Sequence, residues 1–233
     1  MTAEDIIAIL ESNADPEAVT GMARFGITGR NIYGIRIPVL RALAKEIGKD
    51  HALALDLWRI ESRETRILAS MIDKPDALTS SQMESWVAGF DSWEVCDQCI
   101  MNLFEKHPLA WVKAVEWSWR DEEFVKRAGY VLMARLAVSD RSAGVSRFIS
   151  FLQHIERGSG DGRNFVRKAV NWALREIGKR NRRLNAEALA CAGRILTNGG
   201  RPATWIARDA IRELKSPSVQ ARLATKPRGP ETP

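Results

Sequence analysis

The chain has 233 residues, of which 45% are hydrophobic, so it can bury a sizeable core without disulfides or a structural metal. Its net charge is +6, and no apolar run approaches the ~18 residues of a membrane helix. Three cysteines are too few for the disulfide framework of a small secreted domain. The first residues, MTAEDIIAILESNAD, are acidic where a secretory signal peptide is basic. We therefore expect a cytoplasmic protein.

Helix signals recur along the whole chain. Proline stands where a helix can begin at Pro38, Pro75, Pro108 and Pro202. Thr79 and Gln82 have the spacing of a capping box. The alternating apolar and polar runs of β-strands are missing. Helices are predicted over residues 3–13, 16–24, 37–48, 50–60, 62–72, 79–89, 92–106, 108–118, 121–138, 142–156, 163–180, 184–197 and 202–214.

So many helices with short linkers favour an all-α fold of antiparallel helix pairs stacked along one axis. This is an α-solenoid of HEAT-like repeats. The prediction rests on helix count and linker length, because no internal repeat aligns by eye. We expect one solenoid domain over residues 1–222. Residues 223–233, rich in proline and charge, are predicted to form a disordered tail.

A CxxC motif, Cys96 to Cys99, lies within the stretch SWEVCDQC. A zinc site needs four ligands, and the three histidines (His51, His107 and His154) are scattered along the chain. A redox motif would follow a strand, and none is predicted. On a helix both cysteines share a side with Val95 and Leu103, which suits core packing. We therefore predict no metal and no cofactor.

The same stretch holds a tryptophan and an aspartate one helical turn apart. With Ser92 as N-cap, Trp93 and Asp97 share a face in the first turn and a half of the helix. At ~100° per residue they lie about 60 to 100° from the cysteine side, at the edge of the core. The alternative is a surface tryptophan beside a carboxylate favoured by the helix N-terminus.

The basic residues are concentrated near the C-terminus. Between Arg163 and Lys215 there are 13 Lys/Arg against 4 Asp/Glu, whereas the rest of the chain has 22 against 25. Such a block suits a polyanionic partner, with a solvated helical surface as the alternative.

A second tryptophan lies within this basic block, on the helix NFVRKAVNWALREIGKRN. Its apolar stripe consists of Val166, Val170, Ala173 and Ile177. Trp172 instead shares a face with Lys168, Arg175 and Lys179, as in surfaces that bind nucleic acid. Packing of the indole against the next helical layer is the alternative.

Taken together, the stretches SWEVCDQ, EEFVKRAGYVLMARLAV and NFVRKAVNWALREIGKRN resemble the AlkD-like family of DNA alkylation-repair glycosylases. FGITGRNIYGIRIPVLRALAKEIGKD and SRETRILASMID look similar too, so the resemblance covers most of residues 20–215. It implies a HEAT-like solenoid with a concave basic face that holds duplex DNA. The activity it implies is hydrolysis of the N-glycosidic bond of alkylated purines, without extrusion of the base.

The residues that match the family's functional positions are Trp93, Asp97, Trp172 and Arg127. The resemblance implies that Asp97 is the catalytic carboxylate, that both tryptophans cradle the lesion, and that Arg127 holds a phosphate. Lys168, Arg175 and Lys179 are predicted to contact further phosphates. The expected partner is double-stranded DNA with alkylated bases, bound by a monomer. Two other classes stay open: a non-catalytic solenoid that binds branched or bent DNA, and a protein–protein adaptor.

Overall fold

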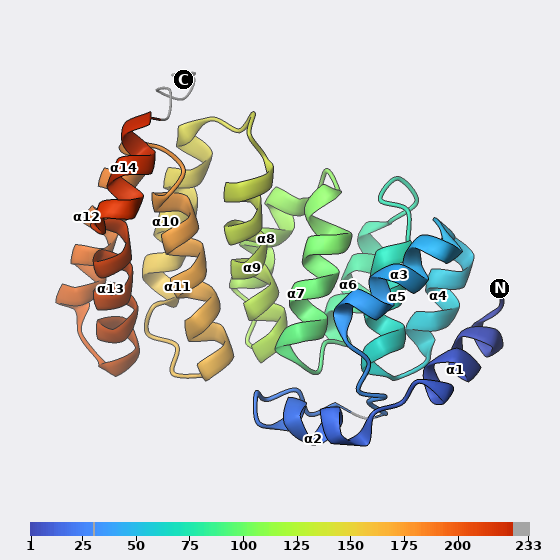
Figure 1. Ribbon diagram of the computed structural model, residues 1–233. Coiled ribbons are helices and arrows are strands. Elements are labelled where there is room, and N and C mark those ends of the chain that lie inside the picture. The colour runs from blue at the N-terminus through green and yellow to red at the C-terminus, as the bar shows by residue number, and fades with distance from the viewer. Residues whose placement is uncertain (30, 226–233) are drawn as a thin grey trace. The chain divides into compact units, whose positions relative to one another are not determined.

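The structure is a computed structural model that describes residues 1–29 and 31–225. Within these two ranges every regular element is a helix, which confirms the all-α prediction (Figure 1). All the helices predicted from the sequence are present, with ends that shift by a few residues. None of the described helices is long and apolar enough to cross a bilayer.

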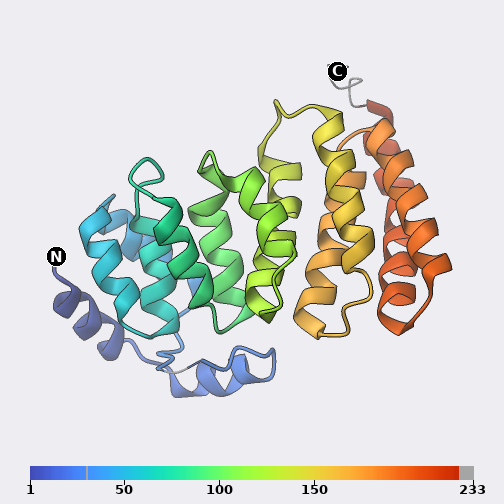
Figure 2. The same ribbon diagram turned by 180° about the vertical axis from the view of Figure 1, so that it is seen from behind.

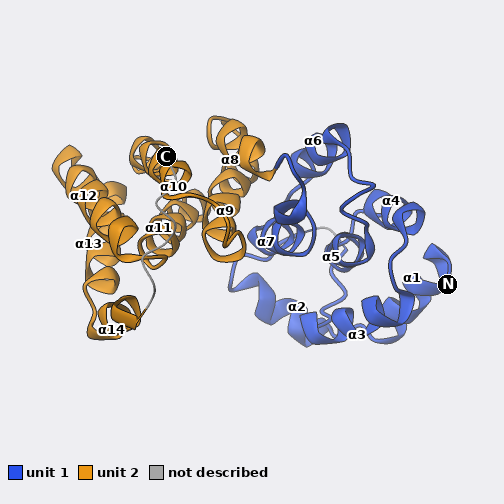
Figure 3. Cartoon of the chain, turned by 90° about the horizontal axis from the view of Figure 1, so that it is seen from above, with its two compact units in different colours: residues 1–109 blue, residues 110–233 orange. Residues whose placement is uncertain are grey.

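Residue contacts divide the chain into two compact units, residues 1–109 and 110–233 (Figure 3). The single domain expected over residues 1–222 stays a prediction. The helices of the first unit are α1 Ala3–Ser12, α2 Pro16–Ala23, α3 Ile37–Ile47, α4 His51–Arg59, α5 Arg63–Ile72, α6 Ser80–Ala88, α7 Trp93–Asn102 and the 3₁₀ helix η1 Phe104–Lys106. Those of the second are α8 Ala110–Ser118, α9 Glu123–Ser139, α10 Val145–Gly158, α11 Asn164–Gly178, α12 Arg182–Asn198, α13 Arg201–Leu214 and α14 Pro217–Thr225.

The first unit is organised around α5, which packs against α3, α4 and α7. Its aromatic core contains Trp58 and Trp86, whose rings stack with centroids 4.1 Å apart. Phe90 contacts the edge of Trp58 and also lies beside Phe104. These rings come from α4, α6, the segment before α7 and η1, and α7, which carries Trp93 and Asp97, packs directly against α5.

The second unit consists of two helical layers. Helices α9, α11 and α13 are neighbours in one layer, and α8, α10 and α12 are neighbours in the other. Across the layers α8 pairs with α9 and α12 with α13, and Figure 2 shows the same helices from behind. Stacked helix pairs of this kind are the arrangement that the short linkers predicted.

Three local predictions need correction. Pro38 and Pro202 lie in the first turn of α3 and α13, but Pro75 and Pro108 lie in turns between helices. Thr79 does cap α6, accepting a hydrogen bond from the backbone of Gln82 at 3.1 Å. The Gln82 amide does not return the bond of a capping box. It donates instead to Asp73 at 2.7 Å.

The C-terminal boundary also differs from the prediction. Helix α14 extends through residue 225, three residues into the predicted tail, and its Val219 and Leu223 are buried. Pro217 lies at the start of this helix, a position that suits proline, and the sequence reading overlooked it. The rest of the predicted tail lies outside the described residues.

Candidate nucleic-acid interface

Trp93 and Asp97 lie at the N-terminal end of α7, as predicted. The Ser92 hydroxyl caps the helix by accepting a hydrogen bond from the backbone N–H of Val95 at 3.4 Å. Trp93 is half-buried, and its indole Nε1 donates to the carbonyl oxygen of Phe25 at 2.9 Å. Phe25 follows α2 and is 73% exposed. The turn after α2 therefore fixes the orientation of the Trp93 ring.

Asp97 lies one turn further along α7 and is a buried residue, 7% exposed. Two features of this position bear on a negative charge at Asp97. One stabilises the charge, and the other strengthens its interaction with a nearby cation. The N-terminal end of a helix carries partial positive charge, which stabilises a carboxylate within the first turns. Low exposure reduces screening by water, so the carboxylate acts more strongly on a nearby cation than it would in solvent. Asp97 is thus suited to stabilising a developing positive charge.

A buried ion-pair network anchors the start of α7, and the sequence reading missed it. Arg63 donates from Nε to Glu94 at 2.7 Å and from Nη1 to Glu64 at 2.7 Å. Glu64 in turn accepts the backbone N–H groups of Tyr33, Gly34 and Ile35. The network ties α5, α7 and the segment before α3 together. Its only signal in the sequence is an adjacent Arg–Glu pair in SRETR.

The cysteines of the CxxC belong to the core. Cys96 and Cys99 are both 0% exposed and neither is in a disulfide, which confirms the packing interpretation. Burial raises the pKa of the Cys99 thiol well above its usual value, so it stays protonated and a poor metal ligand. Across residues 1–29 and 31–225 no group of three or more His, Cys, Asp and Glu side chains could hold a metal ion.

Replacing both cysteines therefore tests the packing role. We expect the Cys96→Ala/Cys99→Ala variant to keep its function and to lose only the stability that small cavities cost, on the order of 1 kcal/mol. Thermal melting measures that loss, and elemental analysis of the wild type should find no stoichiometric zinc. Tightly bound zinc, or lost activity with an intact fold, would contradict this interpretation.

In the second unit, Arg127 of α9 is only 5% exposed. Its Nη1 donates to the carbonyl oxygen of Phe165, in the first turn of α11, at 2.6 Å. This bond joins α9 to α11 and takes one of the donors that the phosphate role would use. Two residues further along α9, Gly129 packs tightly against the backbone of α8. Arg127 thus has a structural function, and its contact with a phosphate stays a prediction.

Only part of the predicted basic stripe of α11 is exposed, and part of it forms ion pairs with α13. Lys168 is exposed and Trp172 is half-buried. Arg175 forms an ion pair with Glu213 of α13, and Lys179 approaches the same carboxylate at 2.8 Å. The C-terminal part of the stripe therefore faces α13, where Glu213 pairs with both Arg175 and Lys179.

These two partners affect the pKa of Glu213. Burial alone would raise its pKa, but hydrogen bonds from Lys179 and Arg175 outweigh burial and lower it. A carboxyl group whose pKa is lowered by folding stabilises the folded protein at pH values above its unfolded pKa of about 4.3. That contribution disappears as the pH falls through the lower folded value.

Salt dependence tests which cations of this stripe reach DNA. We expect Lys168→Ala to lower the slope of log affinity against log salt for duplex DNA by about 0.9. Glu213→Gln should raise the affinity at low salt, because it removes the charge that pairs with Arg175 and Lys179. Lys74→Ala, an exposed lysine of the first unit, is the control. An unchanged slope in Lys168→Ala would place this face of α11 away from DNA.

The family model described as DNA alkylation repair enzyme matches residues 6–214. The chain belongs to this family. No curated protein matches the sequence of this family member. The prediction that it is related to alkylation-repair proteins is confirmed, and the match takes in both units.

Two solved structures are similar to this family member. One was reported for a new family of proteins related to the HEAT-like repeat DNA glycosylases with affinity for branched DNA structures. It has a TM-score of 0.76 and 17% identity, covering 91% of this chain and 95% of the other. This likeness confirms the HEAT-like fold. The other is a designed armadillo repeat protein in complex with a (KR)4 peptide, with a TM-score of 0.37, 15% identity and coverage of 79% and 78%.

Proposed function

We propose that this protein is a DNA glycosylase that hydrolyses the N-glycosidic bond of positively charged alkylated purines in duplex DNA. One observation carries the proposal: a poorly exposed carboxylate, Asp97, lies one turn from the oriented indole of Trp93 at a helix N-terminus. Membership in the alkylation-repair family supports it. The reaction needs no more than such a carboxylate and a water molecule.

The chemistry follows from the charge of the lesion. Alkylation of a ring nitrogen makes the purine cationic, so it leaves readily as a neutral base. The electron pair of the breaking C1′–N bond goes to the purine, and positive charge develops on the sugar. Asp97 stabilises that charge. It also orients the water whose oxygen bonds to C1′ and accepts the proton that the water releases. The products are a free alkylpurine and an abasic site.

The aromatic and cationic residues are assigned to binding. The Trp93 indole offers a π face to the cationic lesion and its sugar, a contact that attracts positive charge. We assign the same role to Trp172 and backbone phosphates to Arg127, Lys168, Arg175 and Lys179. For Arg175 and Lys179 a phosphate would have to replace Glu213. We further propose that the protein acts as a cytoplasmic monomer, associated with the nucleoid when it binds DNA.

Incubation with methylated duplex DNA tests the proposal directly. Release of free methylpurine, with abasic sites appearing in equal amount, is the expected result. Unmethylated duplex DNA is the control and should release no base.

A second function has a specific observation in its favour. The structural relative with a TM-score of 0.76 comes from a family with affinity for branched DNA structures. This protein would then bind junctions without cleaving a glycosidic bond. Binding to a four-way junction much tighter than to a linear duplex, with no base release from either, would favour this alternative. Base release from the linear duplex would contradict it.

A further inference from the structure

The outward face of α13 carries arginine and tryptophan where a surface helix usually carries mixed charges. The four residues of this face, which we call the α13 stripe, follow one another at i, i+4, i+7 and i+11 and are Arg201, Trp205, Arg208 and Arg212. At ~100° per residue they fall within an arc of about 60°. All four are exposed. The sequence reading placed its basic surface on α11 and did not single out this stripe.

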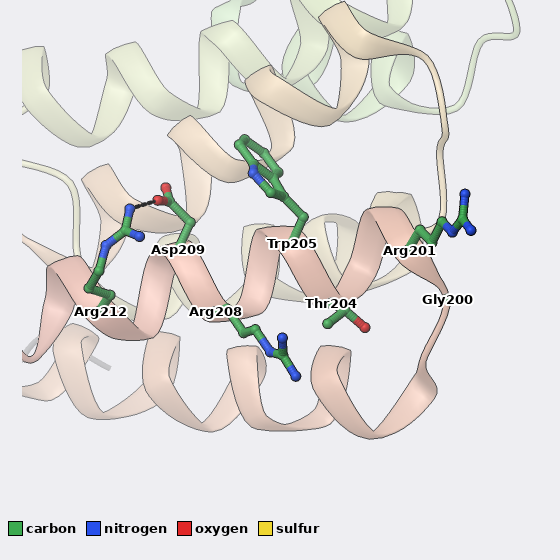
Figure 4. Close-up of a pocket in the computed structure, with 7 residues that line it drawn as sticks. All are labelled: Gly200, Arg201, Thr204, Trp205, Arg208, Asp209 and Arg212. Atoms are coloured by element: carbon green, nitrogen blue, oxygen red, sulfur yellow. Dashed lines mark hydrogen bonds and ion pairs between the residues drawn. The ribbon is translucent and has the colours of Figure 1, made fainter.

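The stripe lines an open pocket of about 630 Å³, within the ~300–1,000 Å³ of small-molecule sites. Gly200, Thr204 and Asp209 complete its wall. In Figure 4, Trp205 and Asp209 point to one side of α13, and Thr204 and Arg208 point to the other. The pocket therefore offers an aromatic ring along one edge and a guanidinium group along the other.

Trp205 is held in place although the residue is 39% exposed. The Arg167 guanidinium of α11 lies over the indole, 4.6 Å from the ring centroid, in a cation–π contact. This contact covers part of the ring and restricts its rotation. The uncovered part of the indole therefore meets solvent in a restricted orientation.

The pocket is strongly positive. Its one carboxylate, Asp209, already forms ion pairs with Arg212 and Arg175 and accepts a hydrogen bond from Asn171 at 2.7 Å. Within the described part of the chain, Arg201 and Arg208 form no ion pair. Their guanidinium groups are available to an incoming anion. A ligand with both negative charge and a flat apolar group satisfies both edges of the pocket.

We propose that the α13 stripe binds a single-stranded segment of DNA, with a base stacked on Trp205 and phosphates on Arg201 and Arg208. From Arg201 to Arg212 the helix rises by eleven steps, about 16 Å, enough for about five nucleotides of a stacked strand at ~3.4 Å each. An exposed indole can stack only on an unpaired base, because the faces of paired bases are covered within a duplex. An acidic peptide would match the arginines but would leave the indole without a flat partner. The proposal goes beyond excision of alkylated bases, which uses Asp97.

Fluorescence anisotropy with a labelled oligothymidine tests the proposal on the full-length protein. We expect Trp205→Ala to weaken binding about 5- to 150-fold, the loss of one stacked base. Trp205→Phe should recover most of the affinity. An abasic oligonucleotide of the same length carries the phosphates without bases, so Trp205→Ala should bind it as the wild type does. Replacing Arg201 and Arg208 by Ser should weaken binding to both ligands and lower the salt slope by about 0.7 per lost contact.

Matched controls separate stacking from damage to the fold. Trp119 of the same unit is 57% exposed and also lies under an arginine, Arg157, so Trp119→Ala should bind oligothymidine normally. Oligothymidine contains no alkylated purine, so this measurement is independent of the glycosylase proposal. The proposal is wrong if Trp205→Ala binds oligothymidine as tightly as the wild type, or loses equal affinity for the abasic ligand. Competition by polyglutamate as strong as that by DNA would indicate an acidic-peptide site instead.

Discussion

Asp97→Asn should reduce the single-turnover rate of methylpurine excision by about 100- to 1000-fold while leaving the affinity for duplex DNA nearly unchanged. Asn has the size of Asp and still accepts a hydrogen bond, but it lacks the charge that stabilises an oxocarbenium-like transition state. Loss of one such electrostatic contact costs ~2.7–4 kcal/mol. The affinity for intact DNA can even rise, because a carboxylate repels phosphates in the ground state.

The measurement pairs single-turnover excision with binding under the same salt conditions. Asp91→Asn is a matched control. Its carboxylate lies two residues before α7 and pairs with Arg66 at 3.2 Å, so its loss should leave the excision rate unchanged. Thermal melting of both variants checks that α7 stays folded. Excision by Asp97→Asn at the wild-type rate would remove Asp97 from the mechanism, and with it the proposed reaction.

Gly129→Ala should destabilise the second unit by roughly 1–3 kcal/mol. Gly129 lies in α9 where this helix crosses α8, and an added Cβ would come within 2.5 Å of the backbone nitrogen of Ser118 and 2.8 Å of the carbonyl oxygen of Ala114. Both atoms belong to the backbone of α8, so a side-chain rotation cannot relieve the clash. The two helices would have to separate. Helices α8 and α9 pack as a pair, and Arg127 lies on α9.

Gly193→Ala is the matched control for this variant. Gly193 lies within α12, and an added Cβ meets no atom within 4 Å. There the higher helix propensity of Ala should stabilise the protein by about 0.5–1 kcal/mol. Denaturant unfolding of both variants should therefore shift in opposite directions. A Gly129→Ala variant as stable as the wild type would show that α8 and α9 are not packed as closely as the structure has them.

Helix positions and the packing of the two cysteines were predictable because their signals are local. Caps, proline positions and apolar periodicity act within a few residues, so the helix that carries Trp93 and Asp97 could be read directly, including its Ser92 cap. Cys96 and Cys99 followed from the same periodicity. Helix α14 was missed because its charged, proline-rich surroundings resemble a disordered tail more than a helix.

Only the tertiary structure decided which charged side chains form ion pairs, because pairing depends on which helices become neighbours. Arg175 and Glu213 are 38 residues apart and Arg63 and Glu94 are 31 apart, and no local pattern couples them.

Tertiary structure also decided whether a stripe of residues faces the core or the solvent. The buried stripe of α11, with Val166 and Val170, and the exposed stripe of α13, with Trp205 and Arg208, both repeat at helical spacing. Sequence alone determined that each helix has two faces and which residues share each one. The stacking of α11, α12 and α13 decided which face meets solvent, because burial is a property of the neighbouring layer and not of the helix itself.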